Sequence, residues 1–254
     1  MRAPNPHSHL VALFLVVLLL TGCDNTPRPT NTITILAAAS LTESLTDITT
    51  AYESEYPDAS ITLAFAGSQI LAAQILEGAR FDLFLSADQF QMDRVRDLVG
   101  APIPFAHGRL VVITPAASNH PDALIALESA TRIAIAAPEV PAGRYAIDAC
   151  KQLGLWDMVR PKTLSLEESV RGALTRVIMG EADAGIVYAS DTRAAPANSI
   201  RIHELPDTVT VRAQYLAAIS DAASNPTAAQ AFLDCLTTNE QAQRILSAHA
   251  FDTP

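Results

Sequence analysis

Short apolar runs alternate with amphipathic stretches along most of the chain. Residues 32–36 (TITIL) are apolar or β-branched, and an apolar stripe at helical spacing follows from Leu41 to Tyr52. The same order recurs twice before residue 109 and restarts at residue 110. This alternation predicts an α/β fold with doubly wound parallel sheets. The predicted strands are 32–36, 61–66, 82–88, 110–114, 132–136 and 184–188, with a late extended segment at 209–219.

Two successive α/β units predict two lobes with a ligand cleft between them. We place the first lobe at residues 32–109 and the second at 110–216, with residues 217–254 returning to the first. The two segments that link the lobes are expected near residues 107–110 and 213–217. Two C-terminal helices are expected to pack on the first lobe. In such sheets ligands bind beyond the carboxyl ends of the strands, where helix N-termini converge.

The N-terminal segment has the features of an export signal. Arg2 precedes an uninterrupted apolar stretch at residues 10–20, which is about half the length of a membrane span. The stretch ends in LTGC, which resembles a bacterial lipobox with Cys23 as the lipidated residue. We therefore predict a signal peptide at residues 1–22 and a tether at 23–31. The alternative is an ordinary signal peptide in which the cysteine occurs by chance.

Charge and cysteine content narrow the class of protein. The formal net charge is −10, and removal of the signal peptide deletes Arg2 and no acidic residue. No basic stripe remains to meet phosphates, which argues against a nucleic-acid partner. Apart from Cys23, Cys150 and Cys235 each lie on the apolar stripe of a predicted helix. We expect buried free thiols there, with a disulfide between them as the alternative.

Motifs of catalysis are missing from the sequence. It contains no GxSxG, Walker, GxGxxG or HExxH pattern. The histidines outside the signal peptide lack metal-ligand spacing, and Asp82 and Asp88 only bound a predicted strand. We therefore predict that the protein is not an enzyme and has no cofactor.

Helix N-termini are the strongest candidates for a binding site. They present unpaired N–H groups and the positive end of a dipole, so they bind an anion without a lysine or arginine. Ser40 also has capping-box spacing to Glu43. Any one serine at a helix start is usually only a cap. Four helix starts shared between two lobes, together with a tyrosine at a strand end, make a stronger case. The candidates are Ser40, Ser68, the turn 141–143, the step 169–170 and Tyr188.

Several segments of the chain resemble the periplasmic molybdate-binding proteins of ABC transporters. The segments are AAASLTESLTDI, FAGSQILAAQI, FDLFLSADQFQMD, PEVPAGRYA, SVRGALTRV and EADAGIVYASD, in order between residues 33 and 251. The resemblance implies a class II periplasmic binding-protein fold that closes on a tetrahedral oxyanion. It also implies a ligand set in which Ser40 and Ser68 donate from hydroxyl and backbone, Ala142 and Val170 from backbone alone, and Tyr188 from its phenol. Gln69, directly after Ser68, departs from the family's small hydroxyl residues.

The implied ligand is molybdate or tungstate, and the implied partner is an ABC permease. Both ions are dianions without a proton near neutral pH, so a shell made only of donors suits them. Monohydrogen phosphate carries a proton that such a shell leaves unpaired, at about 1–3 kcal/mol. Sulfate differs only in size, so a receptor for another oxyanion, or for a small carboxylate, stays open. An exported hydrolase and a structural lipoprotein are the alternatives from other classes. We expect an extracytoplasmic monomer that the lipid on Cys23 anchors to a membrane.

Overall fold

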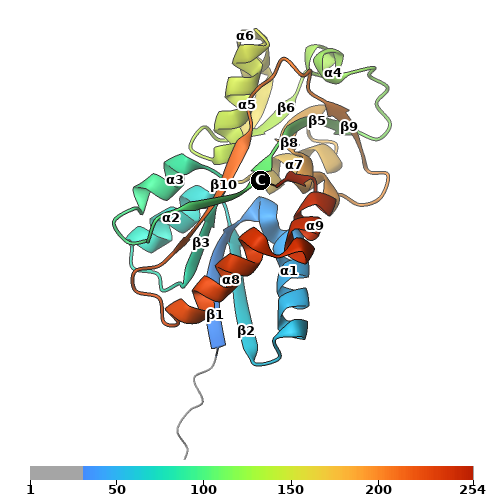
Figure 1. The fold of residues 1–254 in the computed structure, drawn as a ribbon. Helices are drawn as coiled ribbons and strands as arrows, with labels where there is room; N and C mark the ends of the chain where they lie inside the picture. Colours follow the sequence, from blue (N-terminus) through green and yellow to red (C-terminus); the bar gives the residue numbers. More distant parts are fainter. Residues whose placement is uncertain (1–30, 254) are drawn as a thin grey trace, which may run out of the picture.

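The chain forms two sheets, one above the other, each flanked by helices (Figure 1). The computed structural model describes residues 31–253, with only the backbone described at 164–166. The strand order is β11-β4-β10-β3-β1-β2 in the first sheet and β7-β6-β8-β5-β9 in the second. The predicted signal peptide, the lipidation site Cys23 and residues 23–30 of the predicted tether lie outside the described residues. Asn31, the last residue of that tether, begins β1.

The first lobe contains the six-stranded sheet. Its interior strands β1 and β3 are apolar runs buried on both faces, as parallel strands in such sheets are. Its strands are β1 (Asn31–Ala38), β2 (Ala59–Ala66), β3 (Leu83–Ser86), β4 (Ile103–Gly108), β10 (Ala213–Ile219) and β11 (Phe251–Asp252). Its helices are the 3₁₀ turn η1 (Ala39–Leu41), α1 (Thr42–Glu55), α2 (Ser68–Leu76), α3 (Gln89–Arg94), α8 (Pro226–Thr238) and α9 (Glu240–Ala248).

The second lobe contains the five-stranded sheet. Its central strands β6 and β8 are fully buried, whereas the edge strand β9 alternates apolar and charged residues. Its strands are β5 (Leu110–Pro115), β6 (Ile133–Ala136), β7 (Thr163–Glu167), β8 (Ala184–Tyr188) and β9 (Ile200–Glu204). Its helices are α4 (Ala123–Ser129), α5 (Pro141–Gln152), α6 (Trp156–Val159), α7 (Val170–Ile178) and the 3₁₀ turns η2 (Arg160–Lys162) and η3 (Ala189–Ala194).

Both sheets are mixed, which corrects the prediction of purely parallel sheets. β1 is parallel to β2 and β3, and β6 is parallel to β7 and β8. In contrast, β10 runs antiparallel to β3 and β4, and β5 runs antiparallel to β8 and β9. The antiparallel strands β4, β5 and β10 flank the points where the chain passes between the sheets. The α/β class with two helix-flanked sheets is confirmed.

The chain crosses between the sheets twice. It leaves the first sheet between Gly108 and Leu110 and returns between Glu204 and Ala213. Residues 213–216, which we placed in the second lobe, lie in β10 of the first sheet, because Ala213 already pairs with Gly108. The late extended segment is correspondingly shorter than predicted, since the strand begins at residue 213 and not at 209.

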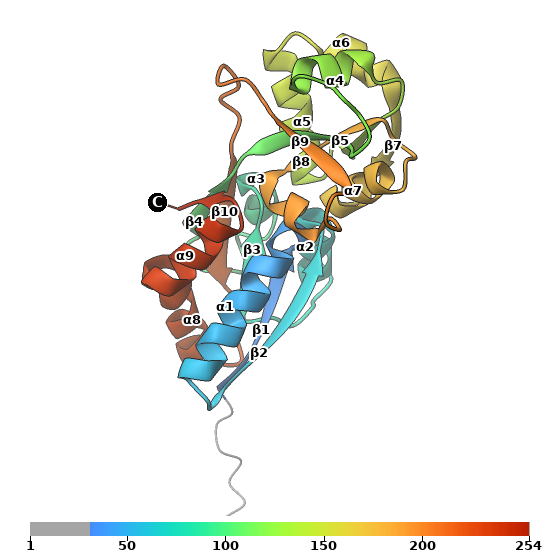
Figure 2. The ribbon, with the colours of Figure 1, turned by 90° about the vertical axis from the view of Figure 1, so that its right-hand side faces the viewer.

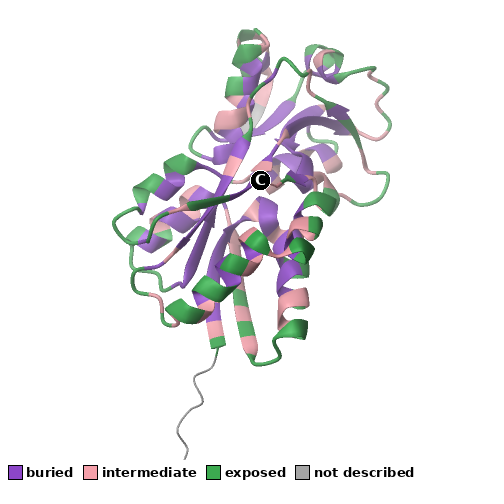
Figure 3. Cartoon of the chain, viewed as in Figure 1, coloured by how far each residue is buried: buried purple, intermediate pink, exposed green. Residues whose placement is uncertain are grey.

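Helices cover both faces of the first sheet (Figure 2). One face packs against α1 and the two C-terminal helices, α8 and α9. The other face packs Leu71 and Ile75 of α2 against Met92 of α3. Figure 3 shows the resulting pattern of buried strands and helices with exposed outer sides. Asp82 fixes the start of β3, because it accepts the N–H of Thr34 at 2.7 Å and that of Ser224 at 2.6 Å.

Aromatic rings fill the junction between the sheets. Tyr215 of β10 contacts Phe105, Tyr188 and Phe251, with ring centroids 6.2, 5.9 and 5.1 Å away. Tyr145 of α5 packs against the other side of Tyr188 at 6.4 Å. This cluster joins the end of β8 in the second lobe to β10 in the first, and it includes Tyr188, one of the residues predicted to bind the ligand.

Candidate ligand-binding site

All five predicted site residues line one small cavity between the two lobes. The cavity has a volume of about 20 Å³, more than the roughly 10–15 Å³ that one water molecule requires. Its walls come from the end of β1, the start of α2, the residue after β3, the starts of α5 and α7, and the end of β8. The lining residues are Ala38, Ala39, Ser40, Gly67, Ser68, Ala87, Val140, Pro141, Ala142, Ser169, Val170 and Tyr188.

Ser40 lies in the 3₁₀ turn between β1 and α1, and it does not cap the helix. α1 begins at Thr42 after Leu41, without a side-chain cap, so the predicted capping box is wrong. The Ser40 hydroxyl instead lies 2.8 Å from the phenol of Tyr215, and Glu43 binds an arginine of the other lobe. When Tyr215 donates in this pair, the Ser40 proton is available to a ligand.

Ser68 is the first residue of α2, and Gly67 occupies the cap position. Ser68 therefore starts its helix without capping it. Its hydroxyl is buried and accepts the N–H of Ala87 at 3.1 Å. Because the oxygen is the acceptor in this bond, the hydroxyl proton is free for another acceptor. Ser68 thus presents both a hydroxyl and an N–H of a first helical turn to the cavity.

Two helix starts of the second lobe supply backbone donors. α5 begins at Pro141, so residues 141–143, predicted as a turn, form its first turn and include Ala142. The next residue, Gly143, packs so closely that a Cβ would overlap the carbonyl oxygens of Ala136 and Ala137 at the end of β6. α7 begins at Val170, and the predicted cap Ser169 is confirmed, since its hydroxyl accepts the N–H of Gly172 at 3.3 Å.

Tyr188 places a phenol at the cavity with no protein partner in the described chain. Its ring is 1% exposed, and its oxygen is buried without a hydrogen bond. Burial, together with the neighbouring phenols of Tyr215 and Tyr145, raises its pKa well above the usual value. The phenol therefore stays protonated at neutral pH and is available as a donor. An unsatisfied buried polar group costs about 1–3 kcal/mol, a cost that an anion in the cavity relieves.

The charged groups beside the cavity are already paired. Arg171, directly after Val170, forms ion pairs with Glu43 and with Asp191. On the other side, Arg144 of α5 pairs with Asp88, which also caps α3 by accepting an N–H. A ligand in the cavity thus meets hydroxyl, phenol and backbone donors, with the neighbouring arginines neutralised. This is the environment that suits a small anion without an exchangeable proton.

Sequence reasoning missed the polar contacts that join the lobes around the cavity. Besides Arg171–Glu43 and Arg144–Asp88, the amide of Gln69 donates to the carbonyl of Glu168 at 2.7 Å. The two partners of each contact are far apart in sequence, so no local motif marks them. Gln69, noted as a departure from the family, is one of these cross-lobe residues.

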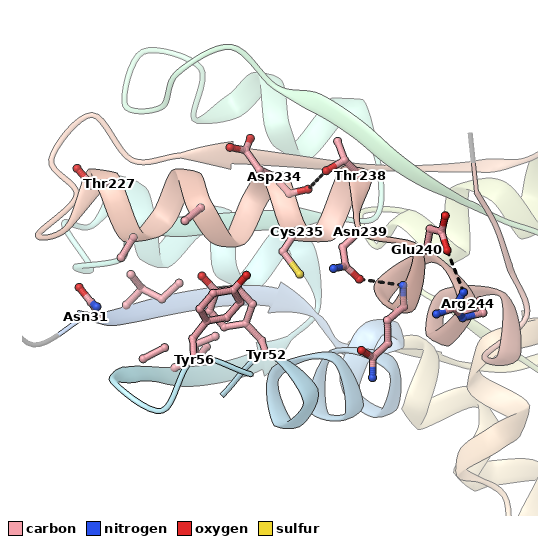
Figure 4. A pocket seen from close by; sticks show the side chains of 16 residues that line it. Asn31, Tyr52, Tyr56, Thr227, Asp234, Cys235, Thr238, Asn239, Glu240 and Arg244 are labelled. Atoms are coloured by element: carbon pink, nitrogen blue, oxygen red, sulfur yellow. Dashed lines mark hydrogen bonds and ion pairs between the residues drawn. The ribbon is translucent and has the colours of Figure 1, made fainter. Parts of the chain in front are cut away.

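A larger cavity of about 970 Å³ lies on the first lobe and contains none of the predicted site residues. Figure 4 shows it between α1, α8 and the start of α9, with the rings of Tyr52 and Tyr56 beside Cys235. Cys150 and Cys235 are free thiols, as predicted, but only Cys150 is buried, and Cys235 is partly exposed. Within residues 31–253, histidines, cysteines and acids form no cluster able to hold a metal ion, and no helix is long and apolar enough to span a membrane.

The fold and the site together define a class of protein. Two lobes joined by two crossing segments enclose a cavity whose donors come from both, which is the arrangement of a solute receptor that closes around its ligand. Residues 33–252 match the family model for bacterial extracellular solute-binding proteins, and the chain belongs to this family.

Individual relatives share most of the chain. It is 38% identical over 231 residues to the molybdate-binding protein ModA of Escherichia coli, covering 86% of this chain and 88% of that protein. It is 32% identical to the putative ABC transporter substrate-binding lipoprotein YvgL of Bacillus subtilis, covering 73% and 75%. The periplasmic molybdate-binding protein of Azotobacter vinelandii has the same fold, with a TM-score of 0.77 at 20% identity, covering 87% and 99%.

Proposed function

We propose that this protein captures molybdate, and tungstate with it, and delivers the ion to an ABC permease. The observation that carries the proposal is the cavity itself, in which Ser40, Ser68, Ala142, Val170 and Tyr188 converge from both lobes. Its similarity to the molybdate-binding protein of Escherichia coli supports the same ligand. The protein acts as a receptor and not as an enzyme.

The chemistry of the lining supports an unprotonated dianion. The two hydroxyls, the phenol and the N–H groups of two helix starts offer protons, while the nearby carboxylates of Glu43 and Asp88 are held by arginines. Monohydrogen phosphate would bring a proton that finds no free carboxylate among the lining residues, and leaving it unpaired costs about 1–3 kcal/mol. Sulfate meets the same donors but is smaller, so a closed cavity of fixed size would leave some of these donors too far from its oxygens.

The setting we propose is the outer face of a membrane. The LTGC sequence at residues 20–23 and the lipoprotein relative of Bacillus subtilis support a lipid on Cys23. A lipid anchor would keep an extracytoplasmic monomer close to its permease. Closure of the two lobes on the ligand would then present a surface from both of them as the signal for transport.

Calorimetric titration of residues 25–254 with molybdate, tungstate, sulfate and phosphate tests the proposal. We expect submicromolar dissociation constants for the first two ions, with sulfate weaker and phosphate without measurable heat. Tight binding of sulfate with weak binding of molybdate would replace the ligand and keep the class. Absence of heat with all four ions would refute an oxyanion receptor.

A further inference from the structure

An arginine and two carboxyl side chains form a cross-lobe cluster next to residues that line the cavity. Arg171 of α7 lies between Glu43 of α1 and Asp191 of η3. Its Nη1 donates to Glu43 Oε1 at 3.0 Å, its Nη2 donates to the second oxygen of the same carboxylate, and its Nε lies 2.8 Å from Asp191 Oδ1. The arginine thus binds the carboxylate of the first lobe through two nitrogens, in the fork geometry that suits it, and forms a one-atom ion pair with that of the second.

Each member of this cluster is close in sequence to one of the cavity residues. Glu43 lies three positions after Ser40, Arg171 directly after Val170, and Asp191 three positions after Tyr188. A displacement of any of the three charged side chains therefore acts on the turn that holds a ligand donor. The salt bridge Arg144–Asp88 joins the lobes too. It pairs its arginine with one carboxylate, whereas Arg171 pairs with two.

The two halves of the cluster differ in what lobe opening does to them. Arg171 and Asp191 both belong to the second lobe, so their pairing is compatible with open and closed forms. Glu43 belongs to the first lobe and reaches Arg171 only when the lobes meet. Asp191 is fully buried, so it fixes the guanidinium in advance, and Glu43 is the partner that is gained on closure.

We propose that Glu43, Arg171 and Asp191 form a closure clasp that retains the bound oxyanion, with Glu43 as its movable part. This inference rests on the proposed function, because oxyanion retention is its readout. The three residues are positioning residues, since they act on the ligand through the turns of Ser40, Val170 and Tyr188. Each ion bound would be released only after the Glu43–Arg171 contact has broken.

The clasp predicts a change in dissociation with little change in association. Truncating a charge pair that forms only in the bound state acts mainly on the dissociation rate. The pair is partly exposed, with side-chain exposures of 22% for Arg171 and 31% for Glu43. For Glu43→Gln we therefore expect molybdate to dissociate about fivefold to tenfold faster, with the association rate within about twofold of the parent protein.

The experiment measures radiolabelled molybdate chased by unlabelled molybdate, at low and at high salt. Added salt should speed release from the parent protein and should have less effect on Glu43→Gln, because that variant has lost the screened pair. Glu181→Gln is the matched control, since Glu181 binds Arg176 within the second lobe alone. Glu43→Asp retains the charge and should recover part of the slow release, and Arg171→Lys gives a second route if Glu43→Gln does not fold.

The possible outcomes separate this inference from the proposed function. If the parent protein binds molybdate and Glu43→Gln releases it at the parent rate, the clasp is wrong and the receptor stands. Equal acceleration of molybdate release in Glu43→Gln and Glu181→Gln would also overturn the clasp. It would mean that release depends on the net charge of the protein and not on the Glu43–Arg171 contact. If the parent protein binds none of the four oxyanions, the receptor and the clasp fall together.

Discussion

Replacing Tyr188 with phenylalanine removes a single oxygen from the cavity. The ring is 1% exposed and packed between Tyr145 and Tyr215, so the smaller side chain keeps the same contacts. The phenol has no protein partner in the described chain, so its loss frees no other buried group. A hydrogen bond to a charged group contributes about 1.5–3 kcal/mol, which corresponds to a roughly tenfold to hundredfold weaker affinity for molybdate.

The same substitution should leave the ligand-free protein as stable as before, or more so. An unpaired hydroxyl is unfavourable in an apolar surrounding, and phenylalanine removes it. We therefore expect the midpoint of thermal unfolding to hold or rise without molybdate, and the shift induced by molybdate to shrink. Tyr52→Phe, in the larger cavity of the first lobe, is the matched control. It should change neither the midpoint of thermal unfolding nor the shift induced by molybdate.

Calorimetry and thermal unfolding of the two variants provide the assay. An affinity of Tyr188→Phe within about twofold of the parent protein would refute the argument that the phenol meets the ligand. A large loss of stability without ligand would refute a second step, because it would mean that the hydroxyl has a structural partner. Either result would direct attention to the serines as the donors from side chains.

Three further substitutions test other parts of the structure. Ser68→Ala should weaken molybdate binding about tenfold or more, by calorimetry, because it removes a donor and leaves the Ala87 N–H unpaired; unchanged affinity would exclude the role. Gly143→Ala should lower the free energy of unfolding in urea by about 2–3 kcal/mol through overlap with Ala137, and a neutral effect would contradict the close packing. Burial raises the pKa of Asp191 to about 7 from an unfolded value near 4, so its contribution to stability falls as pH rises between these values. Asp191→Asn should remove that fall in urea titrations at about pH 5 and about pH 8, and an identical slope would contradict it.

The local part of the fold could be predicted from the sequence. The buried strand at residues 184–188 was predicted with its observed bounds, because an apolar run reports directly on burial. Among the strands that were missed are those at 103–108 and 200–204. The first contains Pro104, and the second alternates with charged residues at a sheet edge, so neither has the apolar run of an interior strand.

Long-range pairing is what the sequence pattern does not contain. The spacing of Ser40 and Glu43 matched a local capping box, yet their partners, Tyr215 and Arg171, are 175 and 128 residues away. An apolar pattern along the chain identifies a strand but not the strands it pairs with. The antiparallel pairing of residues 213–219 with β3 and β4 was therefore seen only in the structure. The five site residues came from helix starts and from the family resemblance, and the structure brings them to one cavity; their contact with a ligand stays a prediction.

The two crossings between the sheets also set the order in which the sheets can be completed. Residues 110–204 contain every strand of the second sheet, so that sheet can pair fully without a strand from the rest of the chain. The first sheet cannot, because β10 fills the space between β3 and β4 and is translated more than a hundred residues after them. The partner of Ser40, Tyr215, arrives on that same strand. A ligand site that includes Ser40 is therefore complete only after this late strand has paired with β3 and β4.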